Sequence, residues 1–231
     1  MRIATIVFAR MDSRRLPGKA LARIAGRPLL GHVLARVRRA RFPALVATSD
    51  RALDDPIAAL AEGEGVACFR GDAEDVAARA LACMERHRFN AIIRISGDSP
   101  FIDPALIEAV AGLFMSNSSV EIATNVHPRS FPPGQSVEVI ARGALARVIA
   151  ETRAAADREH VTRYVYAHPG RFRVVNYAAP AADYAGLGLA VDTPEDLRRA
   201  EWMIGAGAGE AASLADIVAI ARRYAAEHSA Q

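Results

Sequence analysis

Short apolar runs alternate with stretches of helical periodicity along most of the chain. The apolar runs predict strands at residues 3–9, 45–49, 67–70, 91–96, 121–124, 137–140, 171–177 and 187–191. The stretches whose apolar residues recur every three or four positions predict helices at residues 29–41, 56–65, 73–88, 104–116, 142–155, 158–168, 194–204 and 214–227. Alternation of strand and helix in the first half indicates an α/β fold with a mainly parallel sheet and helices on both faces.

The predicted strand at 91–96 has the sequence AIIRIS and is apolar at nearly every position. Such strands are typical of sheets that are covered on both faces. Ligands of these sheets bind beyond the carboxyl ends of the strands. The loops 10–19 and 97–103 both follow predicted strands, so they are the first places to look for function.

Two stretches break the alternation and suggest how the chain is organised. Residues 125–137, NVHPRSFPPGQSV, are rich in Pro, Gly and polar residues, and they predict an excursion from the sheet as a lid or an oligomer contact. Residues 205–213, GAGAGEAAS, follow a helix rather than a strand and predict a flexible connector. We therefore expect one domain at 1–204, with an excursion at 125–140, followed by a Gly/Ala linker and a last helix at 205–231.

Composition excludes several classes of protein. A chain of 231 residues with 52% hydrophobic content can bury a sizeable core. No apolar run reaches the roughly 18 residues of a membrane span, and neither a signal-peptide pattern nor a metal spacing of the two cysteines is present. We expect a reduced, cytoplasmic protein without a membrane partner.

The charge of the chain is +3 and is unevenly placed, with many arginines in the first 50 residues. The arginines at 36–41 serve solubility or attract an anion. Nucleic acid is disfavoured as a partner, because no aromatic residues are interleaved with this charge.

The loop ARMDSRRLPGKAL, at residues 9–21, holds the only lysine of the chain, Lys19, against 28 arginines elsewhere. Lysine and arginine differ chemically, and a chain that uses arginine almost everywhere has a reason to place one lysine here. Arg10, Arg15 and Lys19 can neutralise phosphate oxygens, and Ser13 and backbone N–H groups can donate to them. Gly18 allows a close approach of the ligand.

Neither of two common phosphate loops fits this stretch. The P-loop needs Gly five residues before Gly18 and Ser or Thr after Lys19, but Ser13 and Ala20 stand there. No G-x-G-x-x-G follows the first strand, so the dinucleotide fingerprint is also absent.

The loop resembles the A-R-x-x-S-x-R-L-P-G-K signature of the sugar cytidylyltransferases, closest to the spore coat polysaccharide biosynthesis protein F branch. Further motifs follow in family order to about residue 204: VATSD, FRGDAEDV, RISGDSPFIDP, REHVTRY and VDTPEDL. The resemblance implies a Rossmann-like nucleotide-diphospho-sugar transferase fold. It also implies a homodimer that takes CTP and a sugar, uses Mg²⁺ and does not bind nucleic acid.

Two aspartates are candidates for holding Mg²⁺, which prefers one or two carboxylates together with phosphate and water oxygens. Asp98 follows the strand AIIRIS through Gly97, and Asp192 follows LGLAV. For Asp192 the residues leave an alternative open, because DTPED is also an ordinary helix start with Thr193 as its N-cap. The family resemblance implies that both aspartates are metal ligands. Asp103, before Pro104, is expected to be an N-cap.

The resemblance also implies residues that contact the base. These are the backbone near Ala9, and Ser96, which stands two positions before Asp98. Arg70 in CFRG matches an arginine near the nucleotide, and an ion pair with Asp or Glu is the alternative for it.

The sugar is expected to contact Arg129, Gln135 and Glu138 in HPRSFPPGQSVEVI, where Pro133 and Ser136 replace the usual aspartates of the family. Glu159 and His160 in REHVTRY belong to the same implied substrate site. From the residues alone, a core histidine is the favoured interpretation of His160, and an ordinary helix ion pair with Arg163 four positions later explains Glu159 well.

These observations favour transfer of CMP from CTP to a sugar hydroxyl, with release of pyrophosphate, to make an activated sugar for a surface polysaccharide or glycoconjugate. Arg10, Arg15, Lys19, Asp98 and Asp192 would carry the chemistry. The alternatives are a nucleotidyltransferase of the same fold with another nucleotide or a non-sugar alcohol, and a nucleotide-binding relative without activity.

Overall fold

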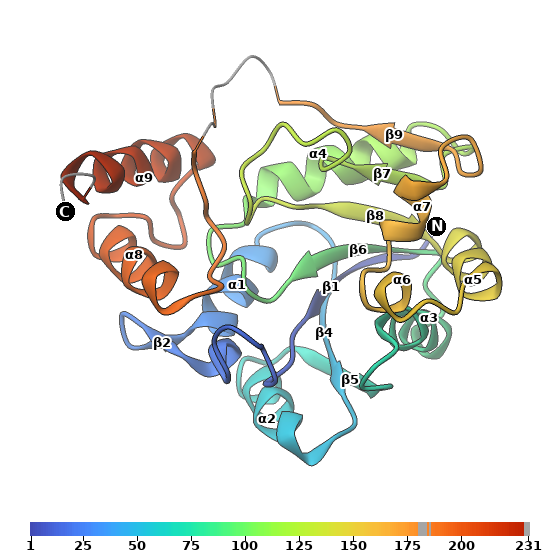
Figure 1. The fold of residues 1–231 in the computed structure, drawn as a ribbon, viewed down its shortest axis with the longest axis horizontal. Helices are drawn as coiled ribbons and strands as arrows, with labels where there is room; N and C mark the ends of the chain where they lie inside the picture. Colours follow the sequence, from blue (N-terminus) through green and yellow to red (C-terminus); the bar gives the residue numbers. More distant parts are fainter. Residues whose placement is uncertain (180–183, 185, 229–231) are drawn as a thin grey trace.

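The computed structural model describes residues 1–179, 184 and 186–228. A seven-stranded sheet with the order β5-β4-β1-β6-β8-β7-β9 forms its centre (Figure 1). The strands are β1 (Ile3–Phe8), β4 (Ala44–Ser49), β5 (Ala67–Gly71), β6 (Ala91–Ser96), β7 (Ile122–Thr124), β8 (Glu138–Ala141) and β9 (Val174–Asn176). β5, β4, β1 and β6 run parallel, as do β7 and β9, and only β8 among these strands is antiparallel to its neighbours. The predicted α/β fold with a mainly parallel sheet is confirmed.

Helices cover both faces of the sheet (Figure 1). The α-helices are α1 (Leu29–Val37), α2 (Asp55–Gly63), α3 (Val76–His87), α4 (Pro104–Met115), α5 (Arg142–Glu151), α6 (Ala155–Glu159), α7 (Arg163–Ala167), α8 (Pro194–Gly205) and α9 (Leu214–His228). Helices α1, α2 and α4 contribute to the core on one face, and α3, α5 and α7 contribute to the core on the other.

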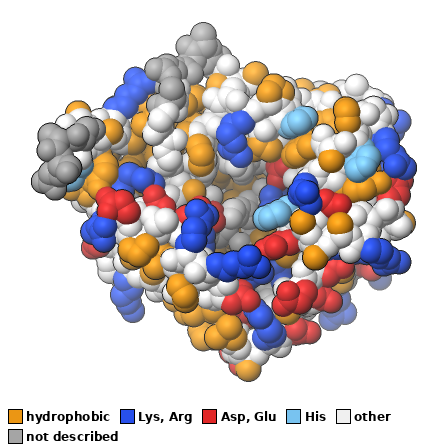
Figure 2. All heavy atoms as spheres, in the orientation of Figure 1, with side chains coloured by type: hydrophobic (Ala, Val, Ile, Leu, Met, Phe, Trp, Pro, Cys, Tyr) orange, Lys and Arg blue, Asp and Glu red, His pale blue; other side chains and the backbone are white. Residues whose placement is uncertain are grey.

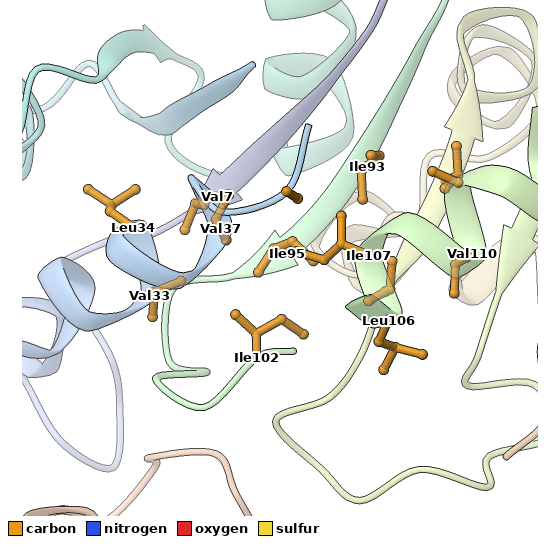
Figure 3. Close-up of a cluster of buried hydrophobic side chains, with 14 of the residues drawn as sticks. Val7, Val33, Leu34, Val37, Ile93, Ile95, Ile102, Leu106, Ile107 and Val110 are labelled. Carbon is orange, nitrogen blue, oxygen red and sulfur yellow. The ribbon is translucent and has the colours of Figure 1, made fainter. Parts of the chain in front are cut away.

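The first of these cores shows why the strands are apolar throughout. Figure 3 shows Val7 and Ile95 of the sheet among side chains from α1 and α4, including Val33 and Ile107. All four side chains are fully buried. Burying a side chain of this size stabilises the fold by about 1.5–3 kcal/mol. Alternate residues such as Ile92 point into the second core, so both faces of β6 need apolar residues.

The predicted strand at 187–191 is wrong. The backbone N–H of Leu189 donates to Pro133 O at 2.8 Å, and that of Val191 donates to Asp98 O at 2.9 Å, so this segment crosses the loops instead of joining the sheet. Leu189 and Val191 are nevertheless buried, in a third cluster with residues of α8 and α9. The apolar pattern therefore came from helix packing and not from strand pairing.

The other differences between the predicted and the observed elements are short elements and one divided helix. The hairpin of β2 (Arg23–Ile24) and β3 (Arg27–Pro28) and the two 3-10 helices, η1 (Lys19–Leu21) and η2 (Ala52–Asp54), are too short to give a periodic signal. The single helix predicted at 158–168 is divided into α6 and α7, because the chain leaves helical geometry at His160.

The last part of the chain is held more firmly than its composition predicts. Arg36, only 2% exposed, donates from its guanidinium to the carbonyl oxygens of Gly209, Glu210 and Ala212 at 2.9–3.0 Å. It also donates to Ile102 O at 2.7 Å. The expected flexible connector is thus fixed to α1, and Arg36 serves neither solubility nor anion attraction.

Among the described residues, no helix is both long and apolar enough to cross a membrane.

Candidate active site

Two loops meet where the order of the parallel strands reverses, between β1 and β6. Ligands of open α/β sheets bind at such a reversal, beyond the carboxyl ends of the strands. Gly97 allows the two strand ends to approach closely, because a Cβ at this position would lie 2.9 Å from both Ala9 Cβ and Phe8 O. Its N–H donates to Phe8 O at 2.8 Å and ties the two loops together.

A cavity of about 420 Å³ opens at this position. Figure 2 shows the hollow near the middle of one face, with cationic and acidic side chains and a histidine around it. The cavity is lined by Phe8, Ala9, Arg10, Ser13, Arg14, Arg15, Lys19, Ala20, Val76, Arg79, Arg94, Ser96, Gly97, Asp98, Glu159, His160 and Asp192. Six cationic side chains face three carboxylates, so the cavity suits an anionic ligand.

Lys19 lies at the centre of the charged groups. Its Nζ donates to Asp98 Oδ2 at 2.9 Å, to Asp192 Oδ1 at 2.8 Å and to Val191 O at 3.1 Å. Burial would lower the pKa of Lys19, but the charge of Asp98 and the hydrogen bonds from both carboxylates outweigh burial and raise the pKa above its ordinary value. The ammonium therefore stays charged at neutral pH. The structure brings together the lysine and the two aspartates that the sequence singled out.

Of the two alternatives that the sequence leaves open for Asp192, the structure shows the helix start directly. Thr193 caps α8 in a capping box with Asp196, so the helix start is as expected. Because Thr193 and Asp196 satisfy the helix end, the carboxylate of Asp192 is left to pair with Lys19 and, at 2.9 Å, with Arg15 Nη2.

The loop after β1 is folded by its own backbone. Gly18 has φ +73°, which favours glycine, and its N–H donates to Met11 O at 2.8 Å. This turn starts η1 and aims Lys19 at the aspartates. The N–H of Met11 donates at 2.7 Å to Asp54, a fully buried carboxylate, so the base of the loop is anchored to η2. Gly18 itself does not line the cavity, and its contribution is to the shape of the loop.

On the opposite wall, Arg10 Nη2 donates to Glu159 Oε1 at 2.6 Å, which joins the loop after β1 to α6. The ion pair predicted within the helix is therefore wrong: Glu159 pairs with Arg10, and Arg163 pairs with Asp157 at 3.1 Å. His160 is exposed at the cavity wall and is not a core histidine.

Arg70 lies outside the cavity lining. Its Nη1 pairs with Asp55 at 2.6 Å, and it donates to the carbonyl oxygens of Ser49 and Arg51 at the end of β4. The structure thus shows the ion-pair alternative for this arginine.

The segment predicted to contact the sugar also lies outside the cavity lining. Gln135 is fully buried, and its side chain donates to Phe101 O at 2.5 Å and accepts from the N–H of Asp103 at 2.9 Å. Arg129 is exposed and donates to Ser136 Oγ at 3.2 Å. The excursion therefore supports the loop after β6 through the hydrogen bonds of Gln135. Pro133 and Ser136, the two residues that depart from the family pattern, do not line the cavity.

Glu138 contacts the cavity only indirectly, through its ion pair with Arg94. It is 3% exposed and accepts from Arg94 Nη1 at 2.6 Å and from the Tyr166 hydroxyl at 2.6 Å. Burial and the nearby carboxylate raise the pKa of Tyr166 far above its usual range, so the hydroxyl stays a donor. Glu138 thus positions Arg94, which does line the cavity.

Sequence reasoning missed Arg79 and Arg94, although each carries a signal. Arg94 is the one charged residue of the apolar strand AIIRIS. Arg79 stands on the buried face of α3, three residues after Val76 and four before Cys83, both of which are buried. A charged residue at a core position has a partner or a ligand as its reason.

Comparison with known proteins agrees with this geometry. A protein family described as cytidylyltransferase matches residues 4–197 of the chain. The spore coat polysaccharide biosynthesis protein SpsF of Bacillus subtilis (strain 168) is 35% identical over 207 residues, which cover 84% of this chain and 82% of that protein. The 3-deoxy-manno-octulosonate cytidylyltransferase of Anaeromyxobacter sp. (strain Fw109-5) is 31% identical over 247 residues, which cover 90% and 99%.

Solved structures show the same fold. A cytidylyltransferase from Leptospira borgpetersenii serovar Hardjo-bovis superimposes with a TM-score of 0.94 at 28% identity, covering 100% of this chain and 98% of that one. A CMP:2-keto-3-deoxy-manno-octonic acid synthetase in complex with CTP superimposes with a TM-score of 0.66 at 18% identity, covering 89% and 99%.

Proposed function

The chain belongs to the cytidylyltransferase family, and on this premise we propose that it transfers CMP from CTP to a hydroxyl group of a sugar and releases pyrophosphate. The family match over residues 4–197 and the similarity to SpsF confirm the resemblance that the sequence motifs indicate. One relative is named for polysaccharide biosynthesis and another for cytidylyl transfer to a sugar acid. The product would be a CMP-activated sugar for a surface polysaccharide or glycoconjugate.

The observation that carries the proposal is the position of Lys19, Asp98 and Asp192 at the carboxyl edge of the sheet. Together with Ser13 and the arginines of the loop after β1, they line one cavity, where they would provide cations for a triphosphate and carboxylates for a metal. Nucleotidyl transfer asks a protein mainly for positioning and for stabilisation of charge, and this set of residues supplies both.

Mg²⁺ fits the two aspartates. Asp98 and Asp192 already hold a cation, the Lys19 ammonium, at 2.8–2.9 Å. Mg²⁺ takes one or two carboxylates from a protein and completes its shell with phosphate and water oxygens. When bound, Mg²⁺ would polarise the α-phosphate and help to activate the sugar hydroxyl.

The other residues of the chain bind and orient the substrates. Arg10, Arg15 and Lys19 would neutralise the triphosphate and the departing pyrophosphate, with Ser13 donating a hydrogen bond. For this, Lys19 has to turn from the carboxylates to the phosphate oxygens. Glu159 and His160 line the same cavity as the two aspartates and would face the acceptor. The cytoplasmic location and the homodimer expected from the sequence stay part of this proposal.

The test is release of pyrophosphate from CTP and Mg²⁺ in the presence of a panel of sugars that includes 3-deoxy-manno-octulosonate and other acidic and neutral sugars. We expect release that depends on one class of sugar, with the CMP-sugar identified by mass spectrometry. Turnover with another nucleoside triphosphate in place of CTP, or no turnover with any sugar, would count against the proposal.

A further inference from the structure

Asp54 is a fully buried carboxylate that does not serve the helix beside it. It stands at the N-cap of α2, yet its side chain makes no capping hydrogen bond. Instead, Oδ1 accepts from the N–H of Met11 at 2.7 Å, and Oδ2 accepts from the Ser49 hydroxyl. Because a buried charge is costly, an N-cap aspartate that does not cap its helix has another reason for its place.

Met11 connects Asp54 with the loop after β1 (residues 9–21). The N–H of Met11 donates to Asp54, and its carbonyl oxygen accepts from the N–H of Gly18 at 2.8 Å. Gly18 directly precedes Lys19, the first residue of η1. The two bonds of Met11 therefore fix the beginning and the end of the loop relative to η2, although neither Asp54 nor Met11 lines the cavity.

A second contact holds the same part of the loop. Arg51, which precedes η2, pairs through Nη2 with Asp12 Oδ2 at 2.6 Å. The other carboxylate oxygen of Asp12 lies 3.3 Å from Arg10 Nε. Since Arg10 lines the cavity, the segment between β4 and α2 orients both the backbone and a cationic side chain of the loop.

We propose that Asp54 is a positioning residue for phosphate binding: it fixes the backbone of Met11 and, through Gly18, sets the place of the Lys19 ammonium. This inference rests on the proposed function, in which the Lys19 side chain turns from the carboxylates to the phosphate oxygens. The backbone that carries Lys19 has to stay in place during this turn, because hydrogen bonds between charged groups depend on distance and angle. Asp54 itself touches no substrate.

A purely structural role is the alternative for Asp54. Its loss would then lower the melting temperature and leave the phosphate affinity of the folded protein unchanged. If Asp54 positions Lys19, its loss should instead remove the contribution of about one hydrogen bond between charged groups. This contribution is on the order of 10- to 100-fold in affinity.

Isothermal titration calorimetry of the full chain with Mg²⁺ separates these outcomes, with tripolyphosphate and CTP as ligands and circular dichroism to establish that each variant is folded. Asp54→Ala removes both acceptors. Asp54→Ser keeps a hydroxyl near Ser49 but is too short to reach Met11, and it provides the test where Asp54→Ala does not fold. Asp54→Asn keeps one carbonyl oxygen for the N–H of Met11 and should rescue binding.

Glu121→Ala is the matched control for lost stability. Glu121 also accepts from one backbone N–H, that of Arg173 at 2.9 Å, and from the side chain of Arg147 at 2.9 Å, but it does not line the cavity. Asp54→Ala and Asp54→Ser are also made in the Lys19→Met background, because a double-mutant cycle measures whether two residues act together.

We expect Asp54→Ala and Asp54→Ser to bind both ligands roughly 10- to 100-fold more weakly than the unaltered chain, with Asp54→Asn and Glu121→Ala within about threefold. In the Lys19→Met background the loss should shrink to less than about threefold. Unchanged affinity in the folded Asp54→Ala or Asp54→Ser variant, or an equal loss with and without Lys19, would overturn the positioning role and leave the proposed function standing. No binding of either ligand by the unaltered chain would overturn both.

Discussion

Replacing Lys19 with Met tests whether the ammonium occupies the place of a divalent cation. Lys19 is held by two charged hydrogen bonds of 2.8 and 2.9 Å, and its side chain is 14% exposed. Without nucleotide, a metal ion has to displace this ammonium from Asp98 and Asp192. Met has a similar length and no charge, so it leaves the two carboxylates free without adding a competing group.

The size of the effect can be worked from these contacts. A hydrogen bond to a charged group contributes about 1.5–3 kcal/mol, and the partial exposure of both carboxylates favours the lower end. Two such bonds therefore oppose the metal by about 3 kcal/mol, which corresponds to roughly 100-fold in affinity. The fold itself should lose only about 1–2 kcal/mol, since Arg15 still pairs with Asp192.

Titration of Mn²⁺, a paramagnetic substitute for Mg²⁺, followed by electron paramagnetic resonance without nucleotide, measures this directly. Lys19→Met should bind Mn²⁺ 10- to 100-fold more tightly than the unaltered chain, while pyrophosphate release with CTP falls at least about 100-fold. Arg23→Met is the control, because Arg23 is an exposed residue that bonds within its own hairpin. Unchanged or weaker Mn²⁺ binding by Lys19→Met would refute the competition, and near-normal turnover would refute the phosphate-loop assignment.

Three further predictions use the same structure. Asp98→Asn should lose Mn²⁺ binding and about 100- to 1,000-fold in turnover but stay folded, and full Mg²⁺-dependent activity would move the metal elsewhere. Gly134→Ala should lower the free energy of unfolding by at least about 2 kcal/mol, because φ is +92° and the new Cβ would lie 2.6 Å from Ala190 N. This loss corresponds to a melting temperature about 4–8 °C lower. Gly143→Ala is the control, because a Cβ at Gly143 would meet open space. Equal melting temperatures for the two variants would contradict the close packing of Gly134 against Leu189 and Ala190. Ser136→Asp should change stability by less than about 1 kcal/mol and leave turnover unchanged, because Ser136 lies outside the cavity lining; a changed sugar preference would return this residue to the substrate site.

The strand-end residues could be predicted from the sequence because their position is local. Lys19, Asp98 and Asp192 each stand just after a buried apolar run or in the loop that follows one, and parallel strands bring such loops to one edge. For Asp192 the local pattern was enough even though the run before it is not a strand. An apolar segment that packs against helices has the same composition as one that pairs in a sheet.

The residues that sequence reasoning misplaced or missed depend on distant partners. Gln135 was assigned to the sugar through its motif, yet its amide bridges backbone groups more than 30 positions away. Glu138 was assigned likewise, but the pairing of β6 with β8 sets it opposite Arg94. Arg79 lines the cavity from α3. The only signal of this in the sequence is that Arg79 stands on the buried face of the helix.

The most direct test of the central claim is thermal unfolding of the purified chain with Mg²⁺ and each of CTP, UTP, GTP and ATP, since it needs no knowledge of the sugar. A ligand at 100 times its dissociation constant adds about 2.7 kcal/mol of stability. For a domain near this size that is roughly 5–11 °C. The account predicts a shift of this size with CTP and a clearly smaller one with the other three nucleotides. Equal shifts with all four, or none with any, would contradict a cytidylyltransferase site in this cavity.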